Sequence, residues 1–148
     1  MKKYVMIHCT ATPEGREVTA AQIDAWHKTR KFEPYTDPKT GRKTYAGYHL
    51  LVHLDGSYER LRPDTARGQH CAKANMNNDA ISICYVGGCA DDGKLTPKDT
   101  RTEAQKRTLL TLVRTLKGRY PGIEVVGHRD YDARACPSFD AKSEYSNT

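Results

Sequence analysis

The segment Ala80-Ile81-Ser82-Ile83-Cys84-Tyr85-Val86 continues directly into Gly87-Gly88 and is the best guide to the fold. It is apolar and rich in β-branched residues, and paired glycines end it. A short run of this kind between turn residues is typical of a buried strand. We therefore predict that residues 80–86 form a central strand of a β-sheet.

Further strands are predicted on both sides of this one. Residues 3–9, 48–54 and 123–127 are short, mostly apolar runs, and Asp55-Gly56 predicts a hairpin that leads into residues 57–62. Side chains alternate along a strand. In the first strand, Val5 and Ile7 should therefore face one side of the sheet, and Tyr4, Met6 and His8 the other.

Two capping boxes predict where helices begin. Thr19-Ala-Ala-Gln22 should start a helix whose inner face carries Ile23, Trp26 and Arg30, with Trp26 as the anchor. Thr102-Glu-Ala-Gln105 should start a second helix, which Pro121-Gly122 ends. The second helix has an apolar stripe formed by Leu109, Val113, Leu116 and Tyr120.

These elements predict one domain of the α/β (α+β) class, in which helices flank a mixed central sheet. A chain of 148 residues suits a single domain. We expect residues 1–142 to form it, with long loops over 31–47 and 63–79. Residues 143–148 form a polar C-terminal tail, and the chain should fray from about Lys142.

Composition limits the possible partners and the compartment. The net charge of +6 suits an anionic partner, either nucleic acid or a cell-wall polymer. No zinc-finger spacing or aromatic RNA-binding signature is present, so nucleic acid is not expected as the main ligand. The five cysteines are an odd number, and no secretory signal opens the chain, so we expect synthesis in a reducing cytoplasm. No apolar run approaches the ~18 residues of a membrane span, so no membrane insertion is expected.

Three residues suggest a metal site. His8 ends the first predicted strand, His128 follows the last one, and Cys136 comes eight positions later in a loop. Zinc accepts this mixture of nitrogen and sulfur, and three protein ligands would leave a fourth position open for catalysis. The spacing alone is a weak signal. It also permits a thiol hydrolase in which Cys136 is the nucleophile and His128 the base, although this hypothesis gives His8 no role. Cys9, next to His8, should face the core.

Four motifs carry a resemblance to a known family. They appear in the family's order and span residues 5 to about 140. The motifs are Ile7-His-Cys-Thr-Ala-Thr12, Gly47-Tyr-His-Leu-Leu-Val52, Ile81-Ser-Ile-Cys-Tyr-Val-Gly-Gly88 and Ala135-Cys-Pro-Ser-Phe-Asp140. Together they resemble the zinc-dependent N-acetylmuramoyl-L-alanine amidases, and more narrowly the short phage lysozyme-type amidases, which are related to the peptidoglycan recognition proteins.

The resemblance implies a zinc ion held by His8, His128 and Cys136, with Tyr48 as a catalytic residue. Phage-type members carry a Lys two residues before the ligand Cys, whereas this chain has Arg134 there. Arginine keeps its charge and is not expected to exchange a proton, so an electrostatic role is predicted.

Four further residues near these motifs are candidates for supporting roles. His70 and Asn78 lie in the loop that, by resemblance, borders the substrate groove, and they are candidates for contacting substrate. Asp130 and Asp132 are candidates for orienting His128, and both are equally compatible with a solvated loop.

The resemblance implies a peptidoglycan hydrolase that cuts the amide bond between N-acetylmuramic acid and L-alanine, with residues 1–142 as its amidase catalytic domain. We expect a monomer that is made in the cytoplasm and acts on the cell wall after release. The short single-domain form favours a phage endolysin over a bacterial recycling or toxin enzyme. The alternative is a non-catalytic peptidoglycan-binding module. The presence of Cys136 argues against it, because recognition proteins without activity typically lack the ligand Cys.

Overall fold

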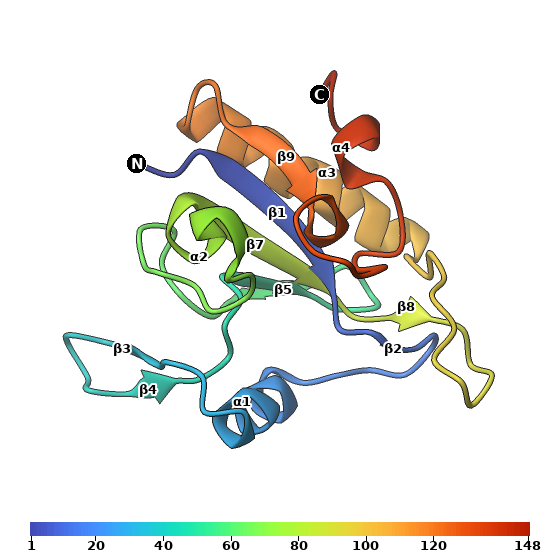
Figure 1. Cartoon of the computed structure of the whole chain (residues 1–148), viewed down its shortest axis with the longest axis horizontal. Coiled ribbons are helices and arrows are strands. Elements are labelled where there is room, and N and C mark those ends of the chain that lie inside the picture. The colour runs from blue at the N-terminus through green and yellow to red at the C-terminus, as the bar shows by residue number, and fades with distance from the viewer.

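The computed structural model describes all 148 residues and centres on a five-stranded sheet with the strand order β6-β5-β7-β1-β9 (Figure 1). β7 (Ala80–Tyr85) lies in the middle, which confirms the predicted central strand. β1 (Tyr4–Cys9), β5 (Leu50–Val52) and β9 (Glu124–Gly127) run parallel within the sheet. β6 (Tyr58–Arg60) pairs antiparallel with β5 through the predicted hairpin. The fold is therefore α/β with a mixed central sheet.

Helices cover both faces of this sheet. α3 (Glu103–Arg119) passes behind it in Figure 1 and packs its Leu109, Val113 and Leu116 into one core with Ile81, Ile83 and Tyr85. On the other face, α1 (Ala20–Thr29) packs Ile23 near Cys84, and α2 (Met76–Asp79) packs Met76 near Met6. Coverage of both faces is the usual condition for parallel strands, and it explains why every residue of β7 is buried.

Both predicted capping boxes are present, at Thr19 and at Thr102, and α3 ends one residue before its C-cap Tyr120. The prediction that Trp26 anchors α1 is wrong, because its side chain is 45% exposed. His27 is buried instead, one turn after Ile23 on the same helix face. Its burial is possible because its Nδ1 accepts a hydrogen bond from the Gly47 amide at 2.8 Å.

Short elements occupy the long connections. The predicted loop 31–47 contains a small hairpin of β3 (Tyr35–Thr36) and β4 (Lys43–Thr44). The connection 63–79 contains a 3-10 turn, η1 (Lys73–Asn75), directly before α2. β2 (Thr12–Pro13) pairs with β8 (Gly88–Cys89), and a second 3-10 turn, η2 (His128–Asp130), follows β9.

The expectation that the chain frays from Lys142 is wrong. α4 (Ala141–Glu144) is followed by Tyr145, whose side chain is 2% exposed and belongs to the core beneath α3. Lys117 donates to the Tyr145 carbonyl at 2.8 Å, and Arg101 pairs with Glu144 at 2.7 Å. An aromatic side chain and two cations therefore hold a segment whose overall composition is polar. None of the helices is long and apolar enough to cross a bilayer.

Candidate active site

Two histidines emerge side by side at one edge of the sheet. β1 and β9 are parallel neighbours, with Ile7 paired to Gly127. His8 and His128 are each one residue beyond this pair, so the strand pairing itself brings them together. Their ring centroids are 4.7 Å apart, and both side chains are buried.

A closed loop brings Cys136 to the same point. The Arg129 amide donates to the Cys136 carbonyl at 2.7 Å, which closes the loop after η2. The Tyr85 hydroxyl donates to the carbonyl of Pro137 at 2.6 Å and ties the loop to the central strand. As a result, the Cys136 Sγ lies 3.8 Å from Nδ1 of His8.

The three side chains form a group suited to a metal ion. One ligand atom from each of His8, His128 and Cys136 lies within 4.8 Å of the others. Around a tetrahedral zinc ion with bonds of about 2.0–2.3 Å, ligand atoms are separated by about 3.3–3.8 Å. The measured 3.8 Å between Cys136 and His8 fits this range. Two imidazoles and one thiol also form a donor set that zinc takes, with a fourth position left open.

The group lies in a cleft with a volume of ≈ 360 Å³. Arg30, Lys73 and Arg134 contribute three cations to its lining, and Asp132 contributes the only carboxylate. Phe32 adds an aromatic wall. The cleft is therefore cationic, and it suits a substrate that carries carboxylates.

Tyr48 belongs to this cleft. Its ring centroid is 5.1 Å from that of His8 and 5.4 Å from that of His27. Burial raises the pKa of the Tyr48 hydroxyl well above its ordinary value. The hydroxyl therefore keeps its proton at neutral pH and is available as a hydrogen-bond donor.

The two loop aspartates have different positions. Asp132 Oδ2 lies 3.7 Å from Nε2 of His128 and accepts a hydrogen bond from Arg134 Nε at 3.0 Å. The bond from Arg134 lowers the pKa of Asp132, which therefore stays ionised. Asp130 instead accepts the Gly127 amide at 2.7 Å and stabilises the turn. Of the two candidates, Asp132 is the one placed to orient His128.

His70 and Asn78, the two predicted substrate contacts, lie in different environments. His70 lines the cleft, and its Nδ1 is 3.0 Å from Nε2 of His8. Asn78 is exposed outside the cleft, with its amide donating to Asn75 Oδ1 at 2.7 Å, and this position does not support a substrate contact. The neighbouring Asn77 is the residue that turns inward.

Sequence reasoning missed several cleft residues. Helical spacing from Ile23 was a usable signal for His27, which is four residues later. The sequence predicts Arg30 on the inner face of α1, and the structure places it in the lining of the cleft instead. Nothing in the local pattern distinguishes Lys73 from other loop lysines.

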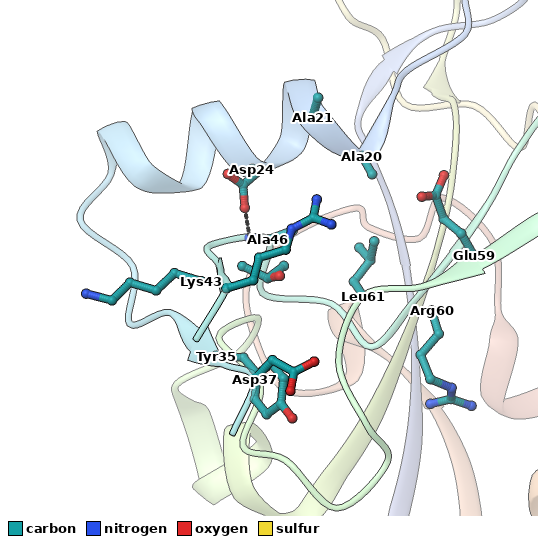
Figure 2. A pocket seen from close by; sticks show the side chains of 12 residues that line it. Ala20, Ala21, Asp24, Tyr35, Asp37, Lys43, Ala46, Glu59, Arg60 and Leu61 are labelled. Atoms are coloured by element: carbon teal, nitrogen blue, oxygen red, sulfur yellow. Dashed lines mark hydrogen bonds between the residues drawn. The ribbon is translucent and has the colours of Figure 1, made fainter. Parts of the chain in front are cut away.

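A second hollow of ≈ 450 Å³ lies between α1, the β3–β4 hairpin and β6, and Figure 2 shows its lining. It contains none of the predicted site residues. Asp24 points from α1 toward Ala46 and accepts its amide (Figure 2). It also accepts the amide of Tyr45. This carboxylate therefore holds the segment that leads to Tyr48.

Comparison with known proteins supplies the family. The sequence profile of the N-acetylmuramoyl-L-alanine amidases matches residues 2–139. The chain belongs to this amidase family. The amidase is 35% identical over 138 residues to the endolysin of Enterobacteria phage T3, a match covering 93% of this chain and 82% of the relative. It is 34% identical to the endolysin of Escherichia phage T7, with the same coverage.

Solved structures share the fold of the amidase. The N-acetylmuramoyl-L-alanine amidase LysC from Clostridium intestinale superposes with a TM-score of 0.73 at 24% identity, covering 97% of this chain and 80% of LysC. The bumblebee protein PGRP-SA superposes with a TM-score of 0.70 at 19% identity, covering 99% of this chain and 81% of PGRP-SA. The predicted resemblance is thus confirmed. The amidase hydrolyses peptidoglycan at the bond between N-acetylmuramic acid and L-alanine.

Proposed function

We propose that His8, His128 and Cys136 hold a catalytic zinc ion and that the cleft around them is the active site of the amidase. The observation that carries the proposal is the convergence of the three ligand atoms within 4.8 Å, at the ends of two neighbouring strands. Supporting it, each imidazole has a further polar partner on its Nε2, His70 for His8 and Asp132 for His128. Such partners commonly orient histidine ligands.

When bound, zinc supplies Lewis-acid polarisation of the scissile carbonyl and brings the pKa of water toward about 7. Tyr48, which stays protonated, donates a hydrogen bond to the negative charge that develops on the carbonyl oxygen. Loss of one such donor typically lowers the rate by about 10²–10³. We therefore assign Tyr48 the stabilisation of the oxyanion.

Arg134 adds positive charge at the same cleft. Its guanidinium is held by Asp132 at 3.0 Å, on the side of the cleft formed by the η2 loop. An arginine does not exchange protons at physiological pH. Arg134 therefore acts through its charge, both on the developing oxyanion and on the carboxylates of the stem peptide.

The biological setting is part of the same proposal. The relatives in phages T3 and T7 are named endolysins, and they are covered over 82% of their length. We extend that role to this chain, as an enzyme that reaches the cell wall after release. Its catalytic domain includes α4 and Tyr145 in addition to the expected residues 1–142, and it acts as a monomer on peptidoglycan.

The thiol-hydrolase hypothesis receives less support. The imidazole that the structure places 3.8 Å from the Cys136 thiol is that of His8, not His128, the base that this hypothesis names.

Metal analysis combined with muropeptide digestion tests the proposal. The purified parent protein should contain one zinc per chain and release stem peptides detectable by mass spectrometry. Cys136→Ala should lose both. Cys89→Ala, which removes a buried cysteine outside the cleft, should keep both. Activity that persists in the absence of zinc and is abolished by a thiol alkylator would overturn the proposal in favour of the thiol hydrolase.

A further inference from the structure

The two ring nitrogens of His8 face two different partners. Nδ1 lies 3.8 Å from the Cys136 Sγ, on the side of the proposed metal. Nε2 lies 3.0 Å from Nδ1 of His70, and the two rings meet edge to face at 88°. The distribution of one proton between these nitrogens therefore depends on His70.

Only one arrangement of protons allows His8 to bind a metal through Nδ1. A metal ligand uses the lone pair of a neutral imidazole nitrogen, so Nδ1 must be free of its proton. The proton is then on Nε2 and is donated to Nδ1 of His70. In the opposite arrangement, His70 donates to His8, and the His8 proton lies on Nδ1, where it blocks the metal.

Contacts to both the backbone and the imidazole of His70 fix its position. Asn77 Oδ1 accepts the amides of His70 and Cys71 at 2.7 and 2.9 Å, and Asn77 is itself buried. Gly68 makes room for the imidazole, because a Cβ at that residue would lie 2.5 Å from the His70 Cδ2.

The other nitrogen of His70 has no partner. Its Nε2 is the one buried side-chain nitrogen or oxygen in the structure without a hydrogen bond. A buried polar atom without a hydrogen-bond partner destabilises the folded state. An imidazole kept at this position despite that cost points to a use for its remaining nitrogen, Nδ1, and that nitrogen contacts only His8.

We propose that His70 is a positioning residue that accepts the Nε2 proton of His8 and thereby selects the His8 tautomer that binds zinc. The inference rests on the proposed zinc ligation by His8. It differs from the prediction that His70 contacts substrate, because it predicts that loss of His70 weakens zinc binding and not substrate binding.

Two substitutions separate the acceptor from the shape of the ring. His70→Phe keeps a flat ring and removes the acceptor, whereas His70→Asn places an amide oxygen near the position of Nδ1. Zinc affinity is measured for each by competition with a chromogenic chelator. We expect about 10–100-fold weaker zinc binding for His70→Phe, the usual effect of losing a partner to a metal ligand. His70→Asn should recover most of that loss.

Urea unfolding of each variant shows whether the substitution has also changed the stability of the fold. The ¹⁵N spectrum of the zinc-loaded parent should show the His8 proton on Nε2. If the parent binds one zinc and His70→Phe binds it within twofold of the parent, the inference is wrong while the proposed zinc site stands. If the parent binds no zinc, both fail. A raised KM with unchanged zinc affinity assigns His70 to substrate binding instead and also overturns the inference.

Discussion

Acidification should destabilise the protein through His49, a histidine next to the site. His49 is completely buried, and its neutral form is fully hydrogen-bonded, since Nδ1 accepts the Ser82 amide at 3.0 Å and Nε2 donates to the Ala66 carbonyl at 2.8 Å. Burial lowers the pKa of His49 from 6.5 to about 4. Between pH 6.5 and pH 4, the unfolded chain therefore binds a proton on His49 that the folded chain does not bind.

The sign and size follow from these two pKa values. The stabilisation is present above pH 6.5 and is lost as the pH falls toward 4. At pH 5, the unfolded histidine is almost fully protonated and the folded one only slightly, which removes about 2 kcal/mol of unfolding free energy. That is a large share of the ~5–15 kcal/mol that a domain possesses.

The assay is urea unfolding between pH 7.5 and pH 5, with a chelator present so that metal release does not contribute. His49→Gln keeps an acceptor and a donor but cannot titrate, so its stability should fall by about 2 kcal/mol less than that of the parent over this range. His53→Gln is the matched control. Burial acts to lower the pKa of His53, but hydrogen bonds with Glu17 and Glu59 raise it overall. Its stabilisation is therefore present below pH 6.5 and is lost as the pH rises, so the effect of this substitution should grow on acidification. Equal losses in the parent and His49→Gln would refute the reasoning.

Two further predictions concern packing. Tyr145→Ala should lower the unfolding free energy by about 3–5 kcal/mol in the same urea assay, because it empties a buried aromatic site. The control Lys142→Ala, at an exposed residue, should change it by less than about 0.5 kcal/mol. A small effect of Tyr145→Ala would show that the tail is not part of the core. Gly47→Ala should lower the thermal stability, because its Cβ would lie 1.8 Å from the Gln69 carbonyl oxygen. Gly118→Ala, in open space on α3, should instead stabilise the protein by up to about 1 kcal/mol, and effects of the same sign in thermal unfolding would contradict the prediction.

Much of the site can be predicted from the pattern of neighbouring residues in the sequence. His8 and His128 are candidates because each follows a run of strand-forming residues, and open sheets bind ligands at the ends of their strands. The opposite orientation of Cys9 followed from alternation along the strand, and Cys9 is indeed buried in the core with Val5 and Ile7. The ordered motifs then supplied the family, which the sequence comparisons confirmed.

Local pattern failed where long-range contacts decided the outcome. Trp26 was the largest apolar residue of its helix and still lies exposed, because the Gly47 amide reaches His27 and makes that residue the buried one. The polar neighbours of Tyr145 predict a frayed tail, but cations from α3 and from the loop before it hold that segment against the core.

The elements, their caps and the residue types that bind a metal can be predicted from the sequence, because hydrophobic period and capping are properties of adjacent residues. The tertiary structure places β1 parallel beside β9, so that His8 and His128 meet. It also decided that Asp132, rather than Asp130, faces His128, and that His70, 62 residues along the chain from His8, contacts its Nε2. Such contacts depend on strand register and loop closure, which no local window of sequence contains.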